Sequence, residues 1–120
     1  MATTFDSELR KAFQELQVKV IDTTQKVKIA EAQIEQLKRA NQHATLTDQE
    51  LRTLQEDTKT YESLGRMFVL QPISDVRTTI SERVKANEEK IKNIEANKDY
   101  LQKSVKSHED SIREMLMHRK

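Results

Sequence analysis

The chain has 120 residues, of which 34% are charged, 35% are hydrophobic and 4% are aromatic. This apolar content is below that of an average globular domain, which excludes a thick hydrophobic core and favours long helices that share a narrow apolar seam. The formal net charge of +1 comes from basic and acidic residues interspersed along the sequence, as on a solvated surface. The absence of cysteine excludes disulfides and is compatible with a reducing compartment.

Several classes of function find no support in the sequence. There is no glycine-rich phosphate-binding loop, and His43, His108 and His118 are scattered without metal-ligand or catalytic-triad spacing. No basic run precedes the helical repeats, as a DNA-binding zipper needs. No apolar run approaches the roughly 18 residues of a membrane span, and the start MATTFDSELRK lacks the pattern of a signal peptide. We therefore expect no enzyme, no cofactor, no metal, no nucleic acid and no membrane partner.

Residues of about 5–45 carry an apolar stripe with alternating steps of four and three residues. This spacing is held over five heptads, and the residues between are mostly charged or amides, so it predicts a coiled-coil helix. The stripe consists of Leu9, Phe13, Leu16, Val20, Thr23, Val27, Ala30, Ile34, Leu37, Asn41 and Ala44.

Residues of about 74–118 repeat this arrangement. The second stripe consists of Ile80, Val84, Asn87, Ile91, Ile94, Lys98, Leu101, Val105, His108, Ile112 and Met115. Because the two stripes have equal length and flank a central insert, we expect the chain to double back and the two helices to pair antiparallel. Asn87 and Lys98 are interpreted as polar seam residues that fix the register, and His108 as a half-exposed seam histidine rather than a switch.

A break after the first long helix is expected at residues of about 43–47. In LTDQEL, Thr47 can cap the amide of Glu50 while the Glu50 side chain returns to the amide of Thr47. This capping-box pattern predicts a separate short helix at residues 47–57.

The stretch GRMFVLQP, residues 65–72, holds the only glycine, the only proline and the longest apolar run of the chain. From the residues alone it permits two structures. One is a helix that ends with Gly65 as its C′ residue; the other is a hairpin that turns at residues 64–66, with MFVL as a strand. Pro72 and Ser74 then restart a helix, with Ser74 as the expected cap.

Neither long helix has a spare face to bury MFVL, because the two seams are committed to one another. A single hairpin has no independent stability in water and cannot bury its own apolar face. As a strand, MFVL must therefore pair with other subunits, so the sequence predicts assembly through this segment.

The layout and several segments of the sequence resemble β-class subunits of eukaryotic prefoldin. TYESLGRMFVLQ, TDQEL, IDTTQKVKIAEAQIEQL and SIREMLM carry the resemblance, which covers essentially the whole chain, and the first is the most specific. It implies a single prefoldin domain over residues 1–120, with strands at about 58–64 and 66–71. The implied fold is mainly α: a long antiparallel two-helix coiled coil with a central β-hairpin (58–71) that joins an inter-subunit β-barrel.

The resemblance also implies a function. Prefoldin is a hexamer of two α-class and four β-class subunits that uses no nucleotide. Its coiled-coil tips capture non-native proteins, chiefly actin and tubulin, and hand them to the cytosolic chaperonin, so the expected location is the cytoplasm. The residues implied for subunit assembly are Tyr61, Leu64, Gly65, Met67, Phe68, Val69 and Leu70. Those implied for the client-binding tip are Phe5, Leu9, Met115, Leu116 and Met117.

The chemistry of the tip agrees with this implication. SIREMLMHRK contains three consecutive apolar residues, Met115 to Met117, and only some of them can enter a two-helix seam. Methionine is unbranched and polarizable, which suits promiscuous apolar surfaces. The alternative is that these residues only close the end of the coiled coil. For the whole chain, the alternative is a structural or tethering coiled-coil adaptor that homodimerises.

Overall fold

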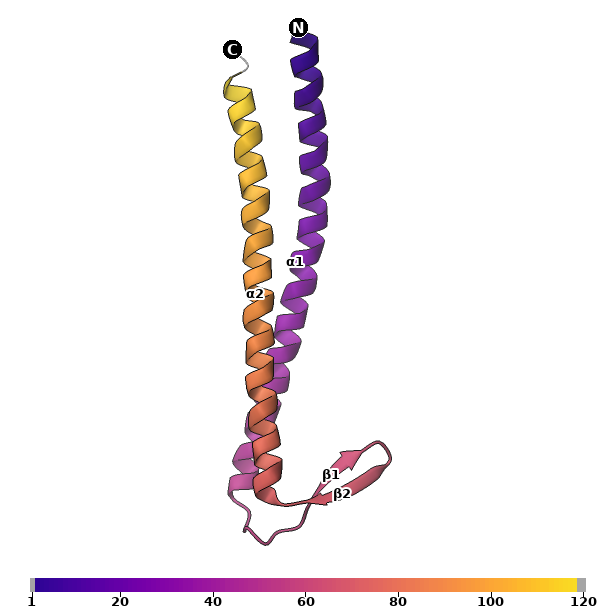
Figure 1. Ribbon diagram of the computed structural model, residues 1–120, viewed down its shortest axis with the longest axis vertical. Coiled ribbons are helices and arrows are strands. Elements are labelled where there is room, and N and C mark those ends of the chain that lie inside the picture. The colour runs from indigo at the N-terminus through magenta and orange to yellow at the C-terminus, as the bar shows by residue number, and fades with distance from the viewer. Residues whose placement is uncertain (1, 119–120) are drawn as a thin grey trace. The chain divides into compact units, whose positions relative to one another are not determined.

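The computed structural model describes residues 2–118, which form two long helices and a hairpin (Figure 1). In chain order the elements are α1 (Ala2–Arg52), β1 (Thr60–Leu64), β2 (Met67–Gln71) and α2 (Ile73–Met117). This confirms the predicted fold class of a long two-helix coiled coil with a central β-hairpin. The single domain over residues 1–120 stays a prediction.

The chain divides into two compact units. The first, which we call the terminal unit, joins Met1–Gln33 to Asn93–Lys120, and the second, the hairpin unit, is Ile34–Lys92. Each unit contains one segment of α1 and one of α2, and the hairpin unit also contains both strands.

The apolar stripes form the seam between the helices, as their spacing predicts. In the first stripe only Phe13 is exposed, and every member of the second stripe is buried or half-buried. The most buried apolar residues are Leu9, Ala30, Ile34, Ile73 and Ile112, and Thr23 is the one buried polar residue among those described. The core is therefore thin, as the composition requires.

Polar contacts across the seam show the antiparallel order within each unit. In the terminal unit, Lys98 Nζ lies 3.1 Å from Glu31 Oε1. In the hairpin unit, Asn87 Nδ2 donates to Asn41 Oδ1 at 2.9 Å. Further along α1 in the same unit, Asp48 Oδ1 accepts from the Nε of Arg77, which comes earlier in α2.

The predicted break at residues 43–47 and the separate helix at 47–57 are wrong, because α1 continues without interruption to Arg52. Thr47 does not cap a new helix: its Oγ1 donates to the carbonyl of His43, one turn earlier in the same helix, at 2.9 Å. The seam also continues, since Asp48 and Leu51 are half-buried at the next four-three positions. A cap at Thr47 would interrupt both the hydrogen-bond ladder and this packing.

Residues 53–59 connect α1 to the hairpin through turns, in which Thr53 N donates to Glu50 O and Thr58 N to Gln55 O. α2 begins at Ile73. The carbonyl of Pro72 accepts from the amides of Asp75 and Val76, so Pro72 occupies the N-cap position and the expectation of Ser74 as the cap is wrong.

The stretch that permitted either a helix end or a hairpin forms a hairpin. β1 and β2 are antiparallel, with Thr60 opposite Gln71 and Leu64 opposite Met67, which leaves a two-residue loop. Gly65 has a φ of 64° in this loop, and Arg66 does not have a positive φ. A glycine with positive φ at the first loop position is typical of a type II′ turn, whose twist matches that of the strands.

Candidate functional site

The hairpin gathers apolar side chains on one of its faces. Tyr61 lies opposite Leu70 and Ser63 opposite Phe68. Because side chains alternate along a strand, these four residues share one face, which we call the apolar hairpin face. Tyr61, Phe68 and Leu70 are 59%, 74% and 57% exposed. A contiguous apolar surface of this kind marks an interaction site.

The opposite face of the hairpin is half-buried near the helices. Its members there are Thr60, Glu62, Val69 and Gln71, and Thr60 Oγ1 donates to the carbonyl of Gln71. Leu64 and Met67 end this face beside the turn and are exposed. Among the apolar residues predicted for assembly, only Val69 is therefore half-buried, and the others are exposed.

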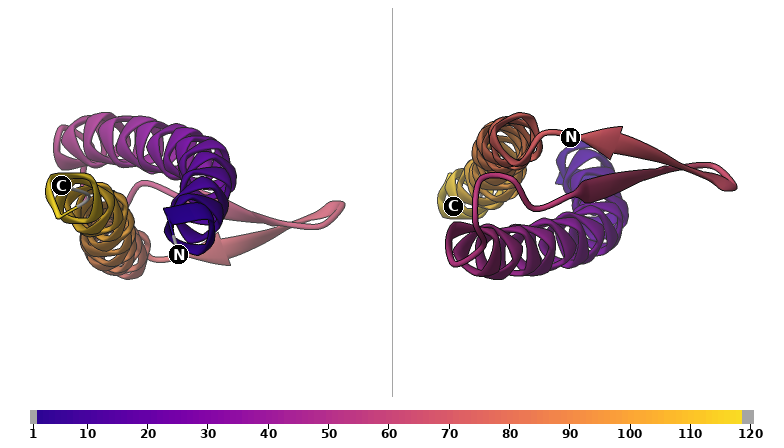
Figure 2. Two further views of the ribbon diagram at one scale, coloured as in Figure 1. Left: turned by 90° about the horizontal axis from the view of Figure 1, so that it is seen from above. Right: turned by 90° about the horizontal axis from the view of Figure 1, so that it is seen from below.

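Both strands also have an unsatisfied edge. Within residues 2–118 the sheet has only these two strands, so the outer edge of each carries backbone N–H and C=O groups with no ladder partner. Figures 1 and 2 show the hairpin projecting sideways from the ends of α1 and α2 that belong to the same unit. A strand of another chain can therefore pair with an edge of this hairpin and cover the apolar hairpin face in the same contact.

Ion pairs join α2 to β1 and to α1 within the hairpin unit. Arg83 Nη2 of α2 lies 3.6 Å from Glu62 Oε1 of β1. Asp48 contacts Arg77 of α2 at 2.9 Å and Arg52 of its own helix at 3.3 Å. The hydrogen bond from Arg77, and after it the charges of Arg77 and Arg52, hold the pKa of Asp48 below its usual value, although partial burial acts in the opposite direction. The two pairs that join different elements were not predictable from local patterns, because their partners are far apart along the chain.

The ends of the two helices in the terminal unit lie side by side (Figure 1). Leu9 is only 5% exposed and packs in the seam, and Phe5 and Met115 are half-buried. Leu116 is exposed and Met117 is 73% exposed. Of the five residues predicted for a client-binding tip, the last two are thus the most exposed.

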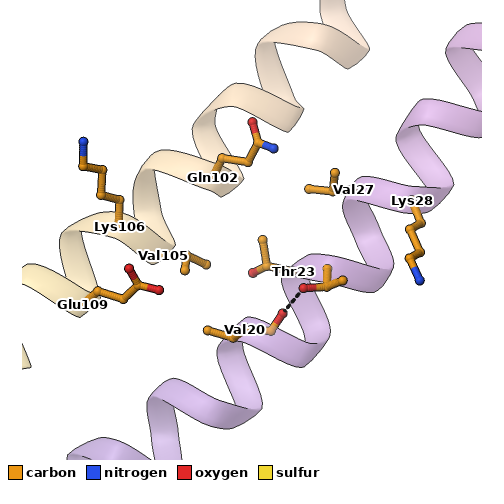
Figure 3. A pocket seen from close by; sticks show the side chains of 9 residues that line it. Val20, Thr23, Val27, Lys28, Gln102, Val105, Lys106 and Glu109 are labelled. Atoms are coloured by element: carbon orange, nitrogen blue, oxygen red, sulfur yellow. Dashed lines mark hydrogen bonds between the residues drawn. The ribbon is translucent and has the colours of Figure 1, made fainter.

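The seam of the terminal unit opens into a cleft of about 550 Å³ that sequence reasoning did not anticipate. Figure 3 shows Val20, Thr23 and Val27 of α1 facing Gln102 and Val105 of α2. The heptad pattern predicts that the stripe members among these residues pack tightly across the seam and leave no cleft. The signal, in retrospect, is that valine and threonine are shorter than the leucine and isoleucine found at other seam positions.

Among residues 2–118, no group of three or more His, Asp or Glu side chains is placed to hold a metal ion. None of the helices in that part has a stretch both long and apolar enough to span a bilayer. The features that stand out are apolar surfaces suited to binding other polypeptides.

Comparison with known proteins identifies the family. Residues 14–119 match the Prefoldin_2 family, which is described as prefoldin subunit, and the chain belongs to this family. It is accordingly a subunit of a prefoldin-type chaperone, and this family assignment implies a hetero-oligomer with other prefoldin subunits.

Within the family, the chain is similar to prefoldin subunit 1 over its full length. It is 56% identical to prefoldin subunit 1 of Homo sapiens, a match that covers 100% of this chain and 98% of the relative. Identity to prefoldin subunit 1 of Arabidopsis thaliana is 36%, over 92% of this chain and 87% of the relative. Its fold is similar to the crystal structure of the prefoldin beta subunit from Thermococcus strain KS-1, with a TM-score of 0.59 at 16% identity, covering 94% of this chain and 90% of that one.

Proposed function

We propose that the chain enters a hexameric prefoldin of two α-class and four β-class subunits through its hairpin. The assembled complex captures non-native actin and tubulin at coiled-coil tips and delivers them to the cytosolic chaperonin, in the cytoplasm and without nucleotide. Membership of the prefoldin subunit family supports this proposal, and the hairpin supplies its physical basis.

The observation that carries the proposal is the apolar hairpin face. Phe68 is the most exposed large apolar side chain on it; Leu70 lies two residues further along the same strand, and Tyr61 lies opposite Leu70. Fully burying a side chain of this size stabilises a complex by about 1.5–3 kcal/mol before entropic costs. Strands of neighbouring subunits would cover this face and satisfy the open edges together, which is how a closed barrel removes its edges.

Client capture is proposed for the exposed end of the terminal unit. Leu116 and Met117 provide the accessible apolar surface, and the half-buried Phe5 and the buried Leu9 lie near the start of α1. Such a surface binds apolar segments weakly and without sequence readout. Several tips that engage one client together raise the overall affinity.

The assembly proposal is tested by Phe68→Asp in the full chain, co-expressed with the other prefoldin subunits. A carboxylate at this position would be buried without a partner in the inter-subunit contact, so we expect the variant to be absent from the hexamer. Native mass spectrometry of the purified complex measures this directly.

Val18→Asp is the matched control, because Val18 is similarly exposed but lies on α1, away from the hairpin. It should enter the hexamer normally. A hexamer that contains Phe68→Asp at the wild-type level contradicts the proposal. A stable homodimer that ignores the other subunits would support a tethering adaptor instead.

A further inference from the structure

The hairpin unit contains a cleft of about 490 Å³, built from α1, β1 and α2. Its apolar lining comes mainly from Ala40 and Ala44 of α1 and from Val76 and Ile80 of α2. The two alanines lie one turn apart on the same helix. Their short side chains leave space that a larger residue at either position would fill.

The threonines in the lining have already used their hydrogen-bond donors. Thr47 Oγ1 donates to the carbonyl of His43 at 2.9 Å. Thr79 Oγ1 donates to the carbonyl of Asp75 at 3.0 Å. Both bonds lie within the threonine's own helix, so neither hydroxyl proton is free for a molecule that enters the cleft.

Two of the larger polar groups of the lining, Asn87 and Arg83, are also partnered within the subunit. The amide of Asn87 donates to Asn41 Oδ1 at 2.9 Å. Arg83 pairs with Glu62 across the gap between α2 and β1 at 3.6 Å. An apolar occupant leaves both contacts intact, and Ala40, Ala44, Val76 and Ile80 offer it apolar surface, so the cleft favours an apolar group.

The cleft borders the hairpin proposed for assembly. β1 contributes Tyr61 and Ser63 of the apolar hairpin face and Glu62 of the opposite face to the lining. A chain docked on the apolar hairpin face or on the edge of β1 is therefore adjacent to the cleft. In protein interfaces, a buried apolar anchor in such a pocket commonly carries much of the binding energy.

We propose that this cleft receives an apolar side chain, aromatic or branched aliphatic, from the adjacent prefoldin subunit. The inference rests on the proposed assembly through the hairpin and adds a second contact to it: a socket formed by the helices as well as the strands. The Arg83–Glu62 pair then serves as a positioning contact that holds the hairpin at the distance the occupant needs.

The test is a competition for assembly. Wild-type chain and Ala40→Leu, in equal amounts, compete for a limiting supply of the other prefoldin subunits, and intact mass measurement of the isolated hexamer gives their ratio. Leucine fills the cleft from α1, so we expect the variant to be depleted about tenfold. Alanine and leucine are both strong helix formers, so the helicity of α1, checked by circular dichroism, should not change.

Two further variants sharpen the result. Ala40→Gln fills the same space with a polar group and should also be depleted. Ala32→Leu makes the same change at an exposed position of α1 outside the lining and should be incorporated on a par with the wild type.

Incorporation of Ala40→Leu at parity with the wild type overturns the proposal. Normal incorporation combined with weaker capture of unfolded actin also overturns it, since the occupant would then be a client. The two variants distinguish a failure of the proposed assembly from a failure of the proposed cleft contact. Normal entry of Phe68→Asp refutes assembly through the hairpin, whereas exclusion of Phe68→Asp with normal entry of Ala40→Leu refutes only the cleft.

Discussion

Asp48 joins the end of α1 to the start of α2 within the hairpin unit. Its carboxylate accepts a hydrogen bond from Arg77 and also contacts Arg52. Asp48 is the acidic member of this cluster, so its protonation in acid removes the negative charge that both arginines contact. The cluster therefore acts as an acid-sensitive link at the base of the hairpin.

The substitution Asp48→Asn should lower the stability of the full chain at pH 7 by up to about 1 kcal/mol, as expected of a partly exposed ion pair. Because the pKa of Asp48 is lower in the folded chain than in the unfolded one, the unfolded state binds more protons in acid. The contribution is complete above the ordinary aspartate pKa of about 4 and is lost as the pH falls through the lower, folded value. Thermal unfolding followed by circular dichroism at pH 7 and near pH 2 measures the effect.

The comparison between the two pH values decides the interpretation. The gap between the wild type and Asp48→Asn should shrink toward zero in acid. An equal gap at both pH values would show that the substitution acts through packing rather than through the charge of the carboxylate.

Single residues differ in how well their conformation and contacts can be predicted from the sequence. Gly65 indicated the turn because only glycine is at ease with positive φ, and the structure places it there. Asp48 gave no such signal, because its main partner, Arg77, comes 29 residues later. Local patterns report on local conformation, whereas contacts of this kind depend on how the chain folds back.

At the scale of elements, the seam was the most predictable feature and the end of α1 the least. Heptad spacing anticipated that the stripe positions from Leu9 to Met115 are covered, with Phe13 as the exception, because the period of the stripe is fixed by helix geometry. The capping-box pattern at Thr47 and Glu50 misled, because a threonine hydroxyl can also donate to a carbonyl one turn earlier inside a helix. The continued seam at Leu51 favours the uninterrupted helix.

The exposed apolar surfaces were predictable only in part. That MFVL needs an external partner followed from the lack of any spare helix face. The half-burial of Val69 and the cleft lined by Ala40 and Ala44 did not follow, because both depend on where the hairpin lies against the helices of its unit. No periodicity in the sequence encodes that placement.

The hydrogen bond between Asn87 of α2 and Asn41 of α1 joins the two helices, and its effect on stability can be tested directly. Asn87→Leu alone should lower the melting temperature, because it leaves the half-buried amide of Asn41 without its partner. The double substitution Asn41→Leu with Asn87→Leu should raise the melting temperature above that of the wild type, since an apolar pair at a seam position stabilises a coiled coil at the expense of register specificity. Thermal unfolding by circular dichroism measures both.

Gln42→Leu serves as the control, because Gln42 is exposed beside Asn41. It should leave the melting temperature almost unchanged. A double variant that melts no higher than Asn87→Leu alone would contradict the interpretation of the pair as a register device.

At the scale of the whole molecule, the two compact units carry different candidate surfaces. The hairpin unit has the apolar hairpin face and the adjoining cleft, and the terminal unit has the exposed Leu116 and Met117. Because the two surfaces share no residues, assembly and client capture should be separable by substitution.

The double substitution Leu116→Ser with Met117→Ser should leave the hexamer intact and weaken its capture of unfolded actin severalfold, because it removes accessible apolar surface without touching the buried Leu9 and Ile112. Suppression of actin aggregation by the assembled complex, at matched concentrations, is the measurement. Val18→Ser with Ile21→Ser, which changes two exposed apolar residues elsewhere in the same unit, is the control. If the tip variant suppresses aggregation as well as the wild type, the tip assignment fails.

Under the assembly proposed for the hairpin, the open edges of β1 and β2 link the order of this segment to the supply of partner subunits. A subunit that binds only the ordered hairpin stabilises it by mass action, so the ordered fraction is expected to rise with the free concentration of such subunits. A surplus of this chain leaves short apolar strands with unpaired backbone groups, which are the templates from which intermolecular sheets grow. The proposed assembly therefore predicts that the tendency of this chain to aggregate rises with its molar excess over the other subunits.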